Sequence, residues 1–422
     1  MDKDLSILLK ECEEAKKDIA DMRNYLHVHP ELSGEEFETQ KYIMDHLKLW
    51  GISYKVIENG GILAELDSGI SGKTLLLRAD VDALPVEETE TNLKAPKVCR
   101  SAASGVSHAC GHDAHTAMLL NALHILSRHR DAFCGRILAV FERGEESAFG
   151  VKPILSYLIE NNIRIDGCFA IHVYAELEEG KISAVPGYVM SGAFGFDAEL
   201  TGRGGHSSRP DMCNNPTDCF VSIYNDLAAI RMRKTDPSEC FTYAVGVLQG
   251  GEKSNVIPQS LHFSVLGRFF NEELTAKPFL EQALRVVELD SEIYECEHKY
   301  NWVMRPTPAV LNDRACAELA QRVWKESLGE EFVASAEPWM ASESYSLYSM
   351  MYPSVLAFLG IRNEEKGMGA AHHTPEFDLD VDLLYKGTEA EIAYALAFLS
   401  PDFEPEKKGD IKKIYEDYSD RF

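Results

Sequence analysis

Residues 107–115, with the sequence Ser-His-Ala-Cys-Gly-His-Asp-Ala-His, hold three histidines, one cysteine and one aspartate. Each of these side chains can bind a divalent metal in the right protonation state. Gly111 allows a sharp turn, so Cys110 and His112 can face one point. The segment has the chemistry of a metal site, although a histidine beside a cysteine also occurs as plain core packing.

The residues that follow predict a helix beginning near Ala114. Apolar residues recur there at helical spacing, basic residues close the last turn, and Asp113 stands where an N-cap is expected. The apolar residues are Met118, Leu119, Ala122, Leu123 and Leu126, and the basic ones are Arg128 and Arg130. A metal site of this kind needs further ligands elsewhere in the chain.

Length and charge restrict the class of protein. A chain of 422 residues is long enough for two domains, and its 68 acidic against 42 basic residues give a net charge of −26. That charge repels phosphate backbones, so a nucleic-acid partner is not expected. No apolar run suits a signal peptide or a membrane span, so we expect a cytoplasmic protein with no membrane partner. The ten cysteines show no short repeated spacing and are interpreted as reduced thiols.

Apolar runs and helical patterns alternate outside the middle of the chain, which favours an α/β fold with a mostly parallel sheet. Strands are predicted at residues 54–58, 62–66, 74–78, 137–141, 168–173 and 355–361, and helices at 5–27, 35–50, 151–159, 313–326 and 382–398. Three of these strands carry acids or a histidine at or near their carboxyl ends: Asp80 and Asp82, Glu145 and Glu146, and His172. Ligands in open α/β sheets bind at that edge, which supports a metal site.

The pattern changes between residues 195 and 300. A strand at 195–202, a helix at 216–231, strands at 240–248 and 261–270, a helix at 273–289 and a strand at 292–300 give the ferredoxin-like order βαββαβ. We therefore expect a discontinuous catalytic α/β/α domain at 1–190 and 304–422. An inserted lid and dimerisation domain is expected at 191–303, with hinges at 187–195 and 301–306. The tail from residue 404 is expected to be a surface helix or partly disordered.

Several motifs, in this order along the chain, resemble those of the M20 metallopeptidases, in particular the amidohydrolase branch with aminoacylases, hippurate hydrolases and auxin-conjugate hydrolases. They are His29-Pro-Glu-Leu-Ser33, Arg78-Ala-Asp-Val-Asp-Ala-Leu-Pro85, His108-Ala-Cys-Gly-His-Asp-Ala-His115, Glu145-Glu146, His172-Val173, Gly202-Arg-Gly-Gly-His206, Asn255-Val-Ile-Pro258 and His373-Thr-Pro-Glu-Phe377. They span most of the chain, and the second and third are long enough to be specific.

The resemblance implies a site for two divalent metals. Cys110 is expected to bridge both, His112 and Glu146 to hold one, and His172 and His373 to complete the other. This donor set suits Mn²⁺ or Zn²⁺, with Co²⁺ and Ni²⁺ as alternatives, better than Mg²⁺ or Ca²⁺.

The resemblance also implies roles for residues around the metals. Glu145 is the expected general base, and Asp82 is expected to orient a ligand imidazole, that of His112. His206 is expected to stabilise the tetrahedral oxyanion, commonly across a homodimer. Asn255 and Arg268 match positions that hold the substrate carboxylate, although Arg268 equally fits a surface strand residue.

Other histidines and several departures from the family pattern receive no such role. Asp113 and His115 are expected to be structural or to support ligands, His372 to be a spectator, and His108 is unassigned. The departures are Arg143-Gly144 for Pro-Ala, Ala175 for a proline, and Glu343-Ser344-Tyr345 for Glu-Asp-Phe. They remove no expected ligand but alter the pocket walls.

The hypothesis from sequence is a metal-dependent amidohydrolase that cleaves N-acyl amino acids or related small amides. One alternative is a di- or aminopeptidase of the same fold, which needs an acidic group to recognise a free amine. A second is a non-catalytic metal-binding protein with a decayed site, against which the retained Glu145 argues. A thiol redox protein using Cys110 lacks a Cys-x-x-Cys partner.

Overall fold

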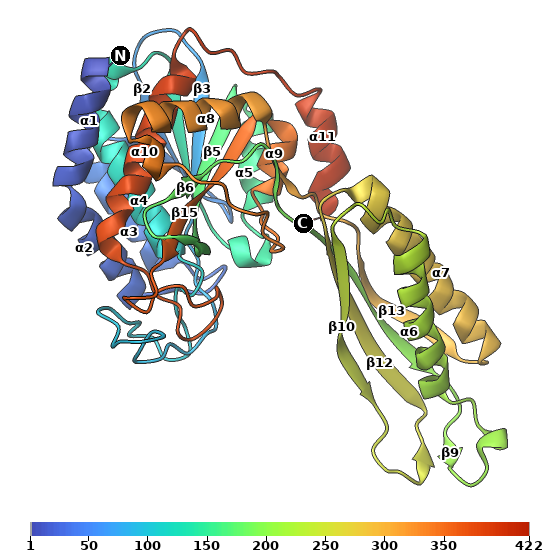
Figure 1. The fold of residues 1–422 in the computed structure, drawn as a ribbon. Helices are drawn as coiled ribbons and strands as arrows, with labels where there is room; N and C mark the ends of the chain where they lie inside the picture. The colour runs from blue at the N-terminus through green and yellow to red at the C-terminus, as the bar shows by residue number, and fades with distance from the viewer. Residues whose placement is uncertain (1, 422) are drawn as a thin grey trace.

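The computed structural model describes residues 2–421 and shows two bodies (Figure 1). The larger body is built on a seven-stranded sheet, and an elongated smaller body with a four-stranded sheet projects from it. The strands of the smaller sheet begin at Gly192 and end at Met304, so the chain leaves the larger body and later returns to it.

The large sheet has the order β1-β2-β4-β3-β5-β15-β6. Its four central strands are parallel, and antiparallel strands form both edges. The strands are β1 (Ser53–Ile57), β2 (Gly61–Asp67), β3 (Thr74–Asp80), β4 (Arg136–Glu142), β5 (Gly167–Glu178), β6 (Ile182–Ser183) and β15 (Ser354–Arg362). Every residue of β3 is buried, as expected for a strand covered on both faces.

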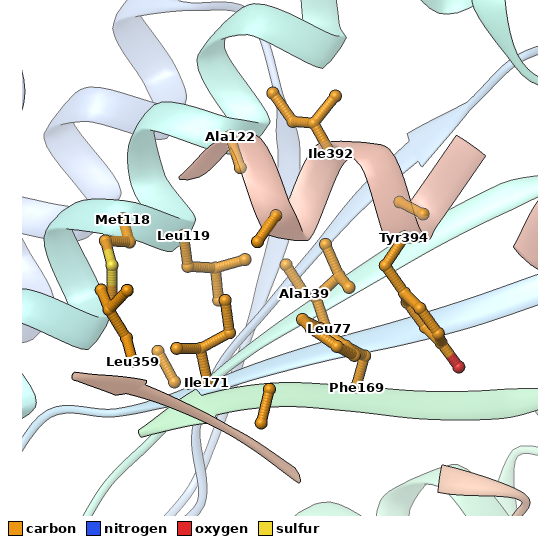
Figure 2. Close-up of a cluster of buried hydrophobic side chains, with 14 of the residues drawn as sticks. Leu77, Met118, Leu119, Ala122, Ala139, Phe169, Ile171, Leu359, Ile392 and Tyr394 are labelled. Carbon is orange, nitrogen blue, oxygen red and sulfur yellow. The ribbon is translucent and has the colours of Figure 1, made fainter. Parts of the chain in front are cut away.

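Helices cover both faces of this sheet, and alternate residues of β3 divide between two cores. Leu75 and Leu77 pack beneath α4 (His112–Arg128) and α10 (Leu384–Leu399), whereas Leu76 faces α5 (Val151–Glu160) and α9 (Ser346–Met351). Figure 2 shows the first core, where Leu119 of α4 and Ile392 of α10 lie over Leu77. The first core also includes α1 (Asp2–Glu14), α2 (Lys16–Val28), α3 (Phe37–Leu49) and α8 (Arg314–Ser327). The α/β/α arrangement predicted from sequence is confirmed.

The smaller sheet has the antiparallel order β10-β12-β8-β13, and two helices pack on one of its faces. Its elements follow the predicted βαββαβ order: β8 (Gly192–Thr201), α6 (Pro216–Arg233), β10 (Phe241–Gly250), β12 (Ser260–Phe269), α7 (Lys277–Ile293) and β13 (Glu297–Met304). A short ribbon of β9 (Gly205–His206) and β11 (Val256–Ile257) belongs to this body. A second ribbon, β7 (Gly187–Met190) with β14 (Val310–Asn312), stands where the chain enters and leaves it.

Two local predictions are wrong. The helix expected over residues 5–27 is two helices, α1 and α2, separated at Ala15. Helix α4 begins at His112 with Gly111 as its N-cap, not at Ala114 with Asp113. Gly111 has φ +93°, and a Cβ there would lie 2.3 Å from a methyl carbon of Val173, so only glycine fits this turn. Asp113 lies in the first turn and pairs with Arg23 and His27 instead.

The tail forms α11 (Ile411–Tyr418) and a short 3-10 turn, Ser419–Arg421, as the surface-helix prediction allowed; Phe422 lies outside the described residues. All ten cysteines are free thiols. Among residues 2–421, no helix combines the length and the apolar character needed to cross a membrane.

Candidate metal centre

The five residues expected to bind metal come from four separate segments and lie together. Cys110 and His112 flank the Gly111 turn at the start of α4, Glu146 follows β4, His172 lies within β5, and His373 lies in the loop after β15. The Cys110 Sγ is 3.6 Å from His172 Nε2 and 3.4 Å from His373 Nε2. The Glu146 Oε1 is 3.2 Å from His373 Nε2 and 3.9 Å from His112 Nε2. We call these five residues the metal-ligand cluster.

The atoms of this cluster fit a metal. The Nε2 of His112 and the Oε1 of Glu146 are buried and form no hydrogen bond with any described residue, a costly state unless a cation satisfies them. Cys110, Glu146 and His373 form one group whose ligand atoms lie within 4.8 Å of one another, and His112, Glu145 and Glu146 form a second. Thiolate, imidazole and carboxylate together suit transition metals and zinc better than Mg²⁺ or Ca²⁺.

The electrostatics point the same way. Burial, then the charges of Glu146 and Glu145, raise the pKa of the Cys110 thiol well above its ordinary value. Burial alone would lower the pKa of His112, but Asp80, Asp82 and Glu146 outweigh it and raise that pKa to about 10. The site therefore has an excess of acidic groups, and a bound dication would supply the missing positive charge and favour the thiolate.

Asp82 joins the two halves of the cluster. Its Oδ1 is 3.0 Å from His112 Nδ1, and its Oδ2 accepts hydrogen bonds from the Glu146 N–H at 3.0 Å and the Ser33 hydroxyl at 2.6 Å. Burial would raise the pKa of Asp82, but His112 and Ser33 outweigh it and lower that pKa. The contact leaves Nε2 of His112 as the nitrogen that faces the cluster.

Asp80 and His115 form a contact that sequence interpretation missed. The His115 Nδ1 is 2.6 Å from Asp80 Oδ1, and its Nε2 accepts a hydrogen bond from the Val173 N–H at 2.8 Å. Both ring nitrogens of His115 are engaged with β3 and β5 in this way. Asp80, His112, His115 and His172 also form a fully buried group whose ligand atoms lie within 4.8 Å of one another. Asp80 also lies 3.7 Å from His112 Nε2. The position of Asp80 at the carboxyl end of β3 was the sequence signal that could have revealed this contact.

Glu145 is buried beside the cluster and has a carboxylate neighbour that sequence interpretation also missed. Its Oε1 accepts a hydrogen bond from the Ser344 N–H at 2.9 Å. Burial, then the nearby charges of Glu343 and Glu146, raise the pKa of Glu145 well above its ordinary value. Glu343 is itself buried and pairs with Arg78 at 3.0 Å. A buried carboxyl group among like charges holds its proton more strongly than a solvated one.

Arg78 supports this acidic region from beneath. Its guanidinium pairs with Asp80 at 2.8 Å and with Glu142 at 3.2 Å, in addition to Glu343. Ser344, where the family pattern has an aspartate, donates its hydroxyl to Glu142 at 2.5 Å. The carboxylate that the family pattern places at position 344 is therefore absent, and the glutamate at position 142 supplies an acid in the same network.

A cavity of about 620 Å³ opens from the cluster toward the smaller body. Arg268 of β12 lines it, as do Trp339, Met190 and Met340. His372 lines it too, and its Nε2 accepts a hydrogen bond from the Ala175 N–H at 3.2 Å. The cavity thus extends from the metal-ligand cluster to the base of the four-stranded sheet.

His206 and Asn255 lie elsewhere. Both are exposed on the β9–β11 ribbon, neither lines the cavity, and the nearest hydrogen-bond partner of the His206 ring is Ser208. His108 is buried beside the cluster, both of its ring nitrogens lack a partner, and burial lowers its pKa to about 4. A neutral imidazole is the form that this environment selects.

Comparison with known proteins gives consistent matches. A model of peptidase family M20/M25/M40 matches residues 76–397. IAA-amino acid hydrolase ILR1-like 2 of Arabidopsis thaliana is 31% identical over 401 residues, which cover 94% of this chain and 88% of that protein. Thermostable carboxypeptidase 2 of Saccharolobus solfataricus is 30% identical over 387 residues, which cover 90% of this chain and 95% of that protein.

Among solved structures, a Bacillus subtilis protein described as a dinuclear metal-binding peptidase from the M20 family superposes with a TM-score of 0.75 at 26% identity. The match covers 91% of this chain and 98% of that one. The family resemblance seen in the motifs and the predicted fold class are thereby confirmed.

Proposed function

The chain belongs to peptidase family M20/M25/M40 and is a metal-dependent hydrolase, and from that premise we propose that it cleaves the amide bond of N-acyl amino acids or related small amides. One observation carries the proposal. Five potential ligands from four segments, Cys110, His112, Glu146, His172 and His373, are linked by distances of 3.2 to 3.9 Å between their ligand atoms, beside the buried carboxyl group of Glu145.

We propose that this cluster holds two divalent metals, Mn²⁺ or Zn²⁺ in the first place and Co²⁺ or Ni²⁺ as alternatives. Cys110, His112, Glu146, His172 and His373 would hold them. When bound, such a pair supplies an activated water and polarises the substrate carbonyl. The similarity to the Bacillus subtilis protein, a dinuclear metal-binding peptidase, supports this number.

The protein residues have separate tasks in this proposal. Glu145 takes a proton from the attacking water and passes it to the leaving amine, a role that its raised pKa supports. Asp82 keeps the His112 ring turned toward the cluster through the Nδ1 contact. His206 and Asn255 reach the reaction from a second copy of the chain, because both are exposed and away from the cavity of their own chain.

We propose residues 1–190 and 304–422 as the catalytic domain and 191–303 as a lid that also forms the homodimer. The exposed apolar residues of the lid, which include Tyr224, Leu248 and Trp302, support a partner surface there. The free state of the ten cysteines supports a reducing, cytoplasmic location.

Charge in the cavity favours an amidohydrolase over an aminopeptidase. The carboxylates that line it, Glu145, Glu146 and Glu343, all lie at the metal end, whereas Arg268 lies toward the smaller body. A guanidinium binds a substrate carboxylate and repels a free ammonium group. The Arabidopsis relative is named an IAA-amino acid hydrolase and the Saccharolobus relative a thermostable carboxypeptidase.

Metal analysis and a substrate screen test the proposal. Protein purified without chelators should contain close to two metal equivalents per chain and should hydrolyse N-acyl amino acids when Mn²⁺, Zn²⁺, Co²⁺ or Ni²⁺ is added. Full activity in metal-free protein would contradict the two-metal mechanism. Turnover restricted to dipeptides with a free amine would select the peptidase alternative, and metal binding without turnover of any amide would select the non-catalytic one.

A further inference from the structure

The segment after α10 lies beyond the family match, which ends at residue 397. It ends in α11 and the turn Ser419–Arg421, and Figure 1 shows it at the junction of the two bodies. The family match therefore does not describe this segment, and its contacts indicate its role.

One side of the segment is anchored on the larger body. Ile411, Ile414, Tyr415 and Tyr418 pack against the second apolar core. The Tyr415 hydroxyl lies 2.7 Å from the Ser156 hydroxyl, and the Lys408 ammonium donates to the Ser349 carbonyl at 2.6 Å. These contacts hold α11 on a rigid surface and fix the direction in which its last turn points.

The last turn contacts Glu272 of the smaller body and the adjoining residues 305–306 through Arg421 and Asp420. The Arg421 Nη1 donates to Glu272 at 2.7 Å and to the Pro306 carbonyl at 2.9 Å, and its guanidinium stacks 4.1 Å from the centre of the Tyr418 ring. Arg305 pairs with Asp420 beside it. The Arg421 side chain is thus oriented by three neighbours and is only 15% exposed.

Arg421 also lines the active-site cavity, together with Arg268 and the metal-ligand residues Cys110 and His172. Its Nη1 is occupied, whereas its buried Nε has no hydrogen-bond partner and its Nη2 donates to no described residue. Nε and Nη2 form one edge of the guanidinium, the edge that can bind a carboxylate with two parallel hydrogen bonds.

Arg268 faces the same space without an acidic partner in the described part of the chain. Burial lowers its pKa, and no carboxylate there forms an ion pair with it. Of the two guanidinium groups that line the cavity, only that of Arg421 has a carboxylate partner among the described residues, Glu272. A net positive charge remains that a substrate anion can neutralise.

We propose that Arg421 is a substrate-binding residue supplied by the C-terminal segment, which binds the carboxylate of the substrate together with Arg268 at the end of the cavity opposite the metals. The proposal deepens the proposed function, on which it rests for the location of the reacting amide. Arg421 belongs to the tail and is held by Glu272 of the smaller body, so the pocket is complete only when the tail is docked.

A binding experiment tests this apart from catalysis. Calorimetric titration of Mn²⁺-loaded Glu145→Gln protein compares N-benzoylglycine with its primary amide, which lacks the negative charge. The Glu145→Gln protein, which keeps Arg421, should bind the acid more tightly than the amide. The additional substitution Arg421→Gln should weaken acid binding about ten- to hundredfold and change amide binding less than about twofold. Arg421→Lys, which keeps the charge, should restore part of the preference.

Arg305→Gln is the matched control, because it removes the neighbouring tail contact without touching the cavity. It should leave the preference for the acid intact. Three results would each overturn the proposal. Arg421→Gln could weaken the binding of acid and amide equally, Arg421→Gln and Arg305→Gln could weaken acid binding equally, or the protein that keeps Arg421 could show no preference for the acid. An activity assay of the unmutated protein separates the two proposals. If the protein hydrolyses no N-acyl amino acid but still binds the acid more tightly than the amide, the proposed function fails and the role of Arg421 in binding stands.

Discussion

The metal end of the cavity and the β9–β11 ribbon of the smaller body contrast in how their functional candidates are arranged. The ligand atoms of Cys110, Glu146 and His373 come from distant parts of the chain and lie within 4.8 Å of one another. His206 and Asn255 are exposed on the ribbon and touch none of them. Folding of one chain brings the first group together, whereas it leaves His206 and Asn255 exposed on the ribbon.

The contrast extends to how each region is supported. Beneath the metal end, the buried guanidinium of Arg78 pairs with Asp80, Glu142 and Glu343, so several carboxylates are fixed by one cation. Removing one partner of such a network leaves uncompensated buried charge. Among the described residues, the His206 ring has no comparable set of ion pairs, and it contacts the Ser208 hydroxyl. The metal end is therefore the more constrained of the two regions.

The largest effect is expected from Glu145→Gln. The substitution keeps the size and the Ser344 contact of the side chain but removes its ability to accept a proton. Turnover should fall about 10²–10⁴-fold while the metal content stays unchanged. Steady-state kinetics with metal analysis of the same sample checks this. Glu160→Gln, at the exposed end of α5, is the control and should change neither value.

The second largest loss of activity is expected from His206→Ala, on the β9–β11 ribbon. If this imidazole stabilises the oxyanion from a partner subunit, kcat should fall about 10²–10³-fold without loss of metal. Mixed dimers of His206→Ala and Glu145→Gln chains should then regain activity, because one of their two sites is intact. His298→Ala, on β13 of the same body and outside the cavity, is the matched control. Verified mixed dimers that stay inactive would argue against the arrangement across subunits.

Sequence alone was informative wherever a local pattern decides the outcome. The apolar run Leu75-Leu76-Leu77 predicted a strand covered on both faces, and that strand lies at the centre of the sheet. The carboxyl ends of parallel strands meet at one edge, so the acids after β3 and β4 could be expected to lie near one another. His373 was expected at the site only because its motif resembles that of a family, since it lies well beyond the end of the predicted strand at 355–361.

What sequence could not supply depends on tertiary contacts. The pairing of Arg78 with Glu142 and Glu343 joins residues far apart in the chain, and no periodic pattern marks it. Asp113 obeys the local rule for an N-cap, but its ion pairs with buried Arg23 and His27 and the left-handed turn at Gly111 prevail. The docking of Arg421 into the cavity likewise follows from packing of α11.

A smaller effect, on stability and not on chemistry, should sharpen the comparison between the two bodies. The Glu88 side chain is 7% exposed and contacts His27 at 3.1 Å, Lys97 at 2.9 Å and the Ser101 N–H at 2.7 Å. Glu88→Gln should reduce the free energy of unfolding by about 1–3 kcal/mol at pH 7, because it weakens hydrogen bonds to a buried charge. The control is Glu273→Gln in the smaller body, whose pair with Lys277 is exposed and should not alter the urea midpoint.

The pH dependence of that loss identifies its cause. Burial by itself would raise the pKa of Glu88, but His27, Ser101 and Lys97 outweigh it and lower the pKa from 4.5 to about 2. Because the folded state holds the ionised form more strongly than the unfolded state, the stabilisation is fully present above about pH 4.5 and is lost as the pH falls toward 2. The difference in urea midpoint between Glu88→Gln and the unmutated protein should therefore begin to shrink below about pH 5. A difference that stays constant from pH 7 to pH 4 would mean that Glu88 acts by packing and not through its charge.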